Sequence, residues 1–347
     1  MKTGYAIFIL ALLLVFTCPL RAGEQKPVIT LMTHDSFAVS DALLKRFEEK
    51  QGATLKILKS GDAGAALTQA ILSKANPLAD VFFGVDNTFL GRALESGIFE
   101  PYGSPLLGKI PDHLKLDPGN HLLPVDFGDV CLNYEKKWFV EKGLRPPAGL
   151  EDLVKPEYKG LTVIQNPATS SPGLAFMLAS IGKFGEKGYL NFWQQLRAND
   201  VYVTAGWSEA YYGKFSRARG GTRPIVVSYA SSPPAEVFYS EKKLDTAPTV
   251  AVLSKGSAFR QIEFVGILKG TRQTRLARRL VDFMLGPEFQ KEIPLYMWVF
   301  PVDPLVPLPE VFIKYARQAE EPVMLTPAAI ETNRERWIES WTEVVLR

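Results

Sequence analysis

Cysteine and histidine are scarce in this chain of 347 residues, which holds two cysteines and three histidines. Cys18 falls within an apolar N-terminal stretch, so Cys131 is the one cysteine in the remainder, where an internal disulfide is therefore excluded. His34, His113 and His121 lack the spacing that zinc sites use. The sequence predicts neither a disulfide-stabilised domain nor a metal centre of the zinc type.

Long apolar runs are also missing, apart from residues 5–16. Lys2 precedes this run, and residues 17–22 form a turn-like stretch that ends on the small residue Ala22. This layout is typical of a secretory signal peptide over residues 1–22 that is cleaved after Ala22. We therefore expect export to the periplasm.

Two alternatives to a cleaved signal peptide remain open at the N-terminus. A retained membrane anchor is disfavoured because the apolar run is shorter than the ~20 residues that a spanning helix needs. A lipid anchor on Cys18 is disfavoured because Val15-Phe16-Thr17 is a poor match for a lipid-attachment site.

Neither sign of charge is in excess. Removal of residues 1–22 deletes Lys2 and Arg21 and no acidic residue, so the formal net charge falls from +3 to +1. Nucleic-acid-binding proteins usually carry a concentrated basic excess, so we predict no nucleic-acid partner. The basic run over residues 272–279 is interleaved with apolar residues at helical spacing, which predicts the solvated side of an amphipathic helix.

Apolar runs and helical patterns alternate along the N-terminal part of the chain, which predicts an α/β unit with a mostly parallel sheet. Ligands gather beyond the carboxyl ends of such strands, where His34, Asp62 and Asp86 are placed by their positions in the sequence. The expected strands span residues 28–32, 55–58 and 81–85, and the expected helices span residues 42–49 and 65–75.

A second α/β unit is expected after residue 126. Its loop over residues 166–173 opens a helix that runs to about residue 182, with Ser171 as cap and Pro172 in the first turn. The expected strands of this part span residues 130–134, 161–164, 202–204, 225–228, 250–253 and 264–268, and its later helices span residues 272–285 and 287–293.

The length fits two α/β lobes joined by more than one crossing better than a single sheet. We assign residues 27–125 and 246–298 to lobe 1 and residues 126–245 and 299–347 to lobe 2.

Two turn-rich segments, residues 206–212 and 228–233, alternate aromatic and small hydroxyl side chains. Rigid aromatic faces beside hydrogen-bonding groups suit a flat, polar or cationic small molecule. These segments predict the rim of a binding pocket.

Several short segments together carry a resemblance to a known family. The narrowest are Trp207-Ser208-Glu209-Ala210-Tyr211 and Ser228-Tyr229, whereas residues 277–290 are common to many solute-binding proteins. Further segments are Asp35-Ser36-Phe37, Gly84-Val85-Asp86-Asn87, Asp126-Phe127-Gly128, Thr169-Ser170-Ser171-Pro172-Gly173-Leu174, Ser232-Pro233 and Trp298 before Pro301-Val302. On these residues the sequence resembles the thiamine-binding periplasmic proteins of ABC importers, over essentially the whole mature chain.

The resemblance implies a type II periplasmic binding protein fold, in which two α/β lobes joined by a hinge close on a ligand. It implies that the ligand is thiamine or a thiamine phosphate and that no further cofactor is bound. It places candidate ligand contacts at an acid, Asp62, and at Ala63, which stands in place of the usual glycine. It adds a hydroxyl pair, Ser170 and Ser171, and a tryptophan that stacks on the ligand, Trp207. Tyr229 and Ser232 would form a rim of the site, and Trp298 would form a wall.

The chemistry of these residues agrees with such a ligand. Asp62 could balance a thiazolium cation, and an aromatic face could add ~0.5–2 kcal/mol by cation–π attraction. The N–H groups at the helix start near Ser171 suit a hydroxyl or a phosphate tail. We add Tyr211 and His34 to the candidate contacts.

The sequence also departs from the family. His34 stands where thiamine binders carry a tyrosine, and Ala235 stands where a further tyrosine is usual. The tryptophan expected shortly after Asp35-Ser36-Phe37 is absent from residues 38–41.

Three other functions compete with this hypothesis. A ferric-ion-binding protein of the same fold could use His34, Asp62 and the pair Tyr211-Tyr212 as ligands, although it has no need of a tryptophan wall. A polyamine-binding protein would favour several carboxylates. An enzyme is suggested by residues 206–210, which imperfectly match a nucleophile elbow, but every histidine precedes this segment, contrary to the hydrolase order.

We therefore predict a monomeric carrier without catalytic activity. Its lobes would close around the ligand by hinge motion, and the closed form would dock on a membrane permease driven by an ATPase.

Overall fold

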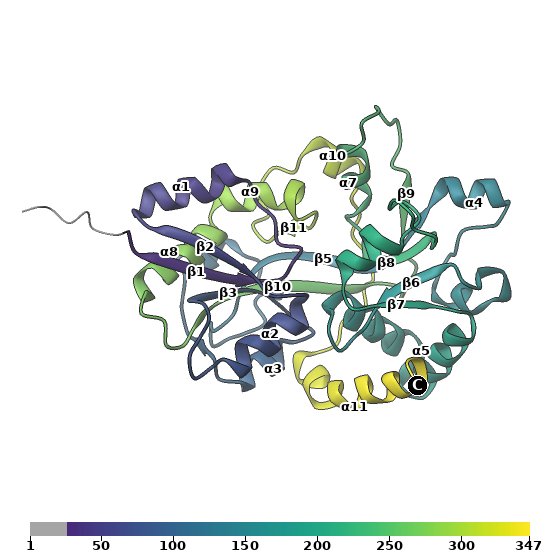
Figure 1. The fold of residues 1–347 in the computed structure, drawn as a ribbon, viewed down its shortest axis with the longest axis horizontal. Helices are drawn as coiled ribbons and strands as arrows, with labels where there is room; N and C mark the ends of the chain where they lie inside the picture. The colour runs from purple at the N-terminus through teal and green to yellow at the C-terminus, as the bar shows by residue number, and fades with distance from the viewer. Residues whose placement is uncertain (1–25) are drawn as a thin grey trace, which may run out of the picture.

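The computed structural model describes residues 26–347, so the predicted signal peptide and Cys18 lie outside the described residues. Figure 1 shows two lobes side by side along the long axis of the molecule. The first lobe is built on β1 (Val28–Thr33), β2 (Thr54–Lys59) and β3 (Val81–Asp86). The second lobe is built on β6 (Thr162–Gln165), β7 (Tyr202–Thr204) and β8 (Ile225–Tyr229).

Other strands extend or connect these two groups, and helices cover them. The remaining strands are β4 (Phe99–Glu100), β5 (Leu123–Glu135), β9 (Thr249–Val252), β10 (Phe259–Leu268) and β11 (Phe300–Pro301). The α-helices are α1 (Asp41–Gln51), α2 (Ala63–Leu72), α3 (Leu90–Glu95), α4 (Lys136–Lys142), α5 (Ser171–Ala198), α6 (Trp207–Glu209), α7 (Pro233–Phe238), α8 (Thr274–Leu285), α9 (Pro287–Tyr296), α10 (Glu310–Tyr315) and α11 (Pro327–Val345). Short 3₁₀ turns span Leu107–Lys109, Asp112–Leu114, Leu150–Val154 and Pro156–Tyr158, and a π-helical turn, Ala210–Lys214, follows α6.

The strands of the described residues join in one mixed sheet with the order β2-β1-β3-β10-β5-β8-β6-β7. Within each lobe the neighbouring strands are parallel, as in β1 with β2 and β6 with β7. The strands β10 and β5 are antiparallel to each other and to their outer neighbours, β3 and β8. The predicted α/β fold with two lobes is confirmed.

The long strands β5 and β10 are the crossings between the lobes. The N-terminal part of β5 pairs with β10, and its later residues 130–134 pair with β8 in the second lobe. The pairing of β10 shifts register between Glu263 and Phe264 on the β5 side and between Phe264 and Val265 on the β3 side. Such irregularities bend a strand locally, so this point is the natural hinge of the sheet. The residue boundaries that we assigned to the lobes stay a prediction.

The local sequence explains the elements next to the site. All six residues of β3 are buried, as expected of a parallel strand covered by helices on both faces. Helix α1 is capped at its N-terminus by Ser40, whose side chain accepts a hydrogen bond from the Leu43 N–H, and at its C-terminus by Gly52 with φ 61°. Helix α11 packs on both α3 and α5, with Trp341 edge-on to Trp193.

Three elements are much longer than the sequence predicted. The strands β5 and β10 begin earlier, at Leu123 and Phe259, because polar residues interrupt their apolar pattern. Helix α5 continues to Ala198 beyond a break at Gly185, whose φ of 70° ends the first helical segment near the predicted point. No helix among residues 26–347 is both long and apolar enough to cross a membrane.

Candidate ligand-binding site

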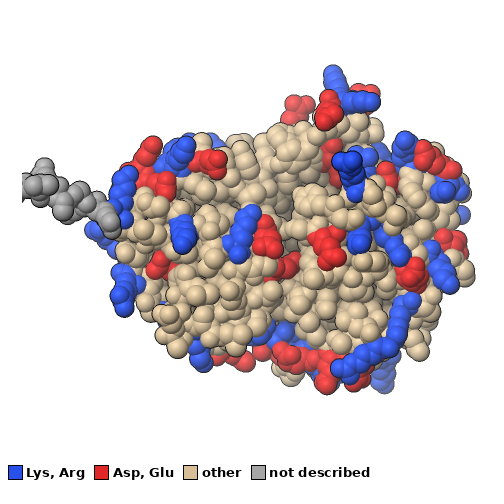
Figure 2. All heavy atoms as spheres, in the orientation of Figure 1, with Lys and Arg blue, Asp and Glu red and all other residues tan. Residues whose placement is uncertain are grey.

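A cavity of about 330 Å³ lies between the two lobes, close to the smaller end of the range for ligand pockets. Figure 2 shows the surface hollowed between the lobes, with side chains of both charges beside the opening. The structure brings nine of the ten predicted contact residues to this cavity: His34, Asp62, Ala63, Ser171, Trp207, Tyr211, Tyr229, Ser232 and Trp298. Their role as ligand contacts stays a prediction.

Asp62 links the two lobes through its carboxylate. It is the N-cap of α2, and its Oδ1 accepts the Ala63 N–H at 2.7 Å. Its Oδ2 accepts the N–H of Trp207 at 2.9 Å and the hydroxyl of Ser170 at 3.1 Å, both from the second lobe. Burial raises the pKa of Asp62, and these hydrogen bonds oppose the rise because they stabilise the carboxylate.

A glycine permits this approach of the lobes. A Cβ on Gly206 would lie 2.8 Å from Oδ2 of Asp62, closer than real Cβ contacts allow. We expect Gly206→Ala to push the carboxylate away from the Trp207 N–H and to weaken ligand binding about 10-fold, the cost of one charge-assisted hydrogen bond. Calorimetric titration measures this. Gly213→Ala is the control, because a Cβ there meets no atom within 4 Å and should leave the affinity unchanged.

The start of α5 is arranged differently from the sequence prediction. The N-cap is Ser170, not Ser171, and the Ser170 hydroxyl donates to Asp62 instead of capping its own helix. Ser170 is fully buried and does not line the cavity. Ser171, the first helical residue, lines the cavity, and its hydroxyl accepts a hydrogen bond of 2.7 Å from Nε2 of Gln261.

Gln261 on β10 joins both lobes beneath the cavity. Its Nε2 also donates to Oδ2 of Asp86 at 2.9 Å, and its Oε1 accepts the Tyr229 hydroxyl at 2.6 Å. Asp86 and Tyr229 belong to β3 and β8, so one amide side chain holds strands from both lobes. The Tyr229 N–H donates to the Ser232 hydroxyl at 3.2 Å.

The ring of Trp207 stacks on Tyr211, with 4.9 Å between ring centroids and 21° between the ring planes. The Trp207 Nε1–H donates to the Ser228 hydroxyl at 2.9 Å, which fixes the ring. Tyr211 is buried and its hydroxyl donates to Glu236 at 2.7 Å, whereas Tyr212 is exposed. Trp207 therefore offers one flat face to the cavity and rests on Tyr211 with the other.

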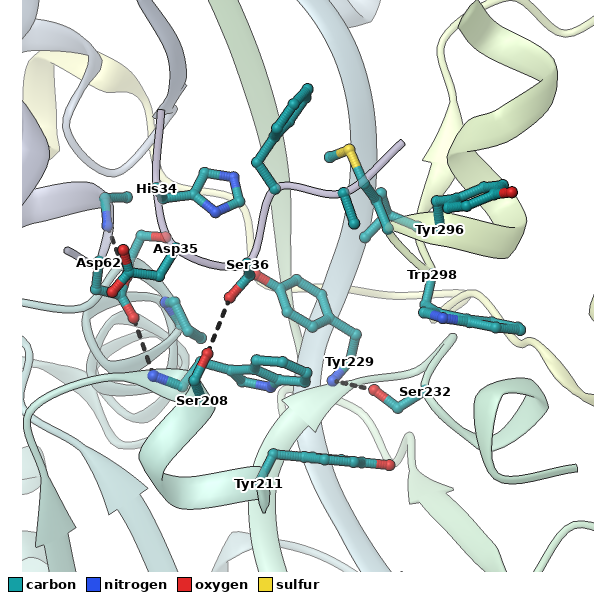
Figure 3. Close-up of a pocket in the computed structure, with 18 of the residues that line it drawn as sticks. His34, Asp35, Ser36, Asp62, Ser208, Tyr211, Tyr229, Ser232, Tyr296 and Trp298 are labelled. Carbon is teal, nitrogen blue, oxygen red and sulfur yellow. Dashed lines mark hydrogen bonds between the residues drawn. The ribbon is translucent and has the colours of Figure 1, made fainter. Parts of the chain in front are cut away.

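Aromatic side chains also form the opposite wall (Figure 3). Trp298 has a φ of 59°, a costly conformation for a residue other than glycine, and the Ser231 hydroxyl donates to its carbonyl at 2.7 Å. Its ring packs against Tyr239 at 5.6 Å, and Tyr239 and Tyr296 both line the cavity. These tyrosines supply aromatic surface to a site in which the family's aromatic residues are replaced at positions 34 and 235 and absent from residues 38–41.

His34 lies on the acidic side of the cavity, near Asp62 and Asp35 in Figure 3. Burial lowers the pKa of His34 to about 4, helped by the nearby Lys59, so the imidazole is neutral at pH 7. A Cβ on Gly84 would lie 2.4 Å from the His34 ring, so glycine at 84, with φ 104°, makes room for it.

The iron-binding alternative finds little support in this arrangement. No three His, Cys, Asp or Glu side chains among residues 26–347 come together as a metal-binding group. Burial and the Glu236 carboxylate raise the pKa of Tyr211 well above its usual range, which opposes the tyrosinate form that iron would need. The hydroxyl of Tyr211 is already bonded to Glu236.

The sequence profile of bacterial extracellular solute-binding proteins matches residues 76–318, which is more than half of the chain. The chain belongs to this family. A thiamine-binding periplasmic protein of Salmonella typhimurium is 34% identical to this solute-binding protein over 97% of the chain and 98% of the relative. The resemblance drawn from the sequence is confirmed by relatives of this kind.

Solved structures show the same fold. A periplasmic thiamin-binding protein superposes with a TM-score of 0.82 at 29% identity, covering 94% of this solute-binding protein and 99% of that chain. A ferric-binding protein from Campylobacter jejuni superposes with a TM-score of 0.71 at 19% identity, covering 91% and 99%. The second likeness, at lower identity, concerns the fold alone, so the iron alternative is not favoured.

Sequence reasoning missed several residues that line the cavity. The most informative is Glu263 on β10, since an ionisable residue between the buried apolar residues Ile262 and Phe264 signals a functional position. Tyr239 and Tyr296 gave no such signal, because each lies near the end of a helix where an aromatic residue is equally suited to packing. Lys59, at the end of β2, also lines the cavity.

Proposed function

We propose that this chain is the periplasmic solute-binding component of an ABC importer and that it binds thiamine between its lobes. The observation that carries the proposal is a single cavity with Trp207 on one wall, Trp298 on the opposite wall and the half-buried carboxylate of Asp62 beside them. A flat thiazolium cation is stabilised by both kinds of group, the rings through cation–π attraction and the acid through charge. The names and similarity of the relatives support the same ligand.

Thiamine phosphates are included in the proposal as secondary ligands. The start of α5 is a poor phosphate site, because the Asp62 carboxylate already lies against it and would repel an anion. Lys59 at the cavity offers a cation, although its Nζ donates to the Asp35 carbonyl at 2.9 Å. We therefore expect thiamine to bind more tightly than its phosphate esters.

The carrier works without turning its ligand over, and it acts as a monomer. Ligand contacts that come from both lobes are completed only when the lobes are closed, so the ligand selects the closed state. The closed form then docks on a permease whose ATPase drives import, as solute-binding components of such importers do.

Calorimetric titration of the mature chain with thiamine, thiamine phosphates and ferric iron tests this proposal. We expect thiamine to bind one to one and Trp207→Ala to weaken binding about 10-fold, through loss of cation–π attraction and of buried aromatic area. Trp207→Phe is the matched control, because it keeps a flat ring and should retain most of the affinity.

Two results would contradict the proposal. Wild-type affinity for thiamine in both Trp207→Ala and Asp62→Ala would show that the ligand does not bind in this cavity. Tight ferric binding accompanied by tyrosinate–iron colour would favour the rival ligand.

A further inference from the structure

Glu263 and Asp126 form a pair of buried carboxyl groups at the floor of the cavity. They are directly opposite each other on the antiparallel strands β10 and β5, at the register shift that marks the hinge. Glu263 lines the cavity, whereas Asp126, with 0% exposure, lies behind it. Side chains opposite each other in such a pair have Cβ atoms about 5 Å apart, so the two carboxyl groups meet.

Within residues 26–347, Asp126 lacks the hydrogen-bond donors that a buried carboxylate needs. Neither oxygen of Asp126 has a hydrogen-bond partner among the described groups, and Nε2 of His34 also has none. That Nε2 lies 3.5 Å from Oε1 of Glu263, and the His34 residue is 8% exposed. An unpaired buried polar atom is costly, and His34 lines the cavity, so a ligand there can supply the missing partner.

The surroundings of Glu263 are acidic. Burial, followed by the charges of Asp126 and Asp86, raises the pKa of Glu263 well above its usual range, and the pKa of Asp126 is raised to about 8 by burial. The pair therefore holds a proton at neutral pH. The titratable and charged groups around Glu263 are Asp126 on β5, Asp86 on β3, Asp62 on α2, Tyr229 on β8, and His34, Asp35 and Lys59 at the ends of β1 and β2.

Nearby cations do not neutralise this cluster. Lys59 extends to the Asp35 carbonyl, and Arg260 on the same strand as Glu263 pairs with Asp129. His34 is neutral at pH 7, because burial lowers its pKa to about 4. A cationic ligand is therefore the group that can balance an ionised Glu263.

We infer that Glu263, supported by Asp126, is a second acidic contact for a cationic ligand and that binding expels to solvent a proton held by this pair. The inference rests on the proposed function and names a residue for it. The entering cation favours the carboxylate form of Glu263, the carboxyl O–H bond breaks, and the proton passes to buffer. By linkage, affinity for the cation then rises with pH while the pair is still protonated in the free protein.

Titration calorimetry in two buffers tests this directly. The mature chain is titrated with thiamine at pH 7 in phosphate and in Tris. Because the ionisation enthalpies of these buffers differ, the difference in observed binding heat gives the number of protons released per thiamine. We expect release of a substantial fraction of one proton per thiamine, and a dissociation constant that falls by up to about 10-fold per pH unit above pH 6.5.

Two variants locate the source of the proton. Glu263→Gln should bind thiamine about 10-fold more weakly, with no proton release and no pH dependence in this range. Asp126→Asn should bind at least as tightly as wild type but release less proton, because Glu263 without its like-charged neighbour ionises more readily before binding. Asp112→Asn, a fully exposed site paired with Lys115, should match wild type in both respects.

The outcomes separate the inference from the proposed function. Thiamine binding to wild type with equal heats in both buffers, after correction for dilution, overturns the inference and leaves the proposed function standing. Wild-type proton release in Glu263→Gln also overturns it. If Glu263→Gln fails to fold, the inference is still tested by the difference in wild-type binding heat between the two buffers and by the proton release of Asp126→Asn. Absence of thiamine binding to wild type defeats the proposed function and the inference together.

Discussion

Asp62→Asn is expected to weaken thiamine binding about 100-fold. The asparagine keeps the shape of the side chain and can still accept from the Trp207 N–H, but it loses the negative charge. Hydrogen bonds to a charged group contribute about 1.5–3 kcal/mol against 0.5–1.5 kcal/mol for neutral ones, and two bonds across the lobes are affected. The attraction for the ligand cation is lost as well, and about 2.7 kcal/mol in total corresponds to 100-fold.

Calorimetric titration at pH 7 measures this loss, and thermal unfolding without ligand checks that the variant is folded. Asp112→Asn removes the same charge at a fully exposed position and should retain wild-type affinity. An Asp62→Asn protein that is folded and binds thiamine as tightly as wild type would show that this carboxylate is merely the cap of α2.

Asp126→Asn is expected to change how stability depends on pH. Burial raises the pKa of Asp126 from 3.8 to about 8, so between these pH values the folded protein holds a proton that the unfolded chain has lost. The free energy of unfolding therefore falls as pH rises, by up to about 1.4 kcal/mol per pH unit for each such group. Asn cannot titrate, so the variant should show a clearly smaller slope and be the more stable protein above pH 8.

The informative window is pH 6.5 to 8. Below pH 6.5 His34 acts in the opposite direction, because its pKa is lowered to about 4 and the unfolded chain is then the one that binds the extra proton. Urea unfolding at three pH values within the window gives the slope, and it requires no ligand. A wild-type protein whose stability rises or stays constant from pH 6.5 to 8 would contradict the burial of these acids in a protonated form.

The sequence predicted the alternation of strands and helices well, because apolar runs such as residues 81–85 are short and are bounded by polar residues, here Asp80 and Asp86. It failed where polar residues serve the site from within a strand. Asp126 and Glu263 interrupt the apolar patterns of β5 and β10, so the predicted strands start several residues later than the observed ones. Tertiary pairing, not local preference, sustains these strands at such positions.

The site was predicted from segments near Trp207 and Tyr229 and from a family resemblance, both of which are local in sequence. Such local patterns could not predict which residues distant in the sequence contact each other. Ser170 was expected to face the ligand, yet its hydroxyl is bonded to Asp62, 108 residues away. Tyr239 and Tyr296 come to the cavity only through the packing of α7 and α9, which no sequence pattern encodes.

The placement of the tryptophans makes the chain its own optical reporter. Of six tryptophans, Trp207 and Trp298 line the cavity, while Trp193 and Trp341 are buried against each other and do not line it. A ligand that stacks on the first two would quench or shift their emission and leave the buried pair as a constant background. Stopped-flow fluorescence could then follow ligand capture in real time without any attached dye.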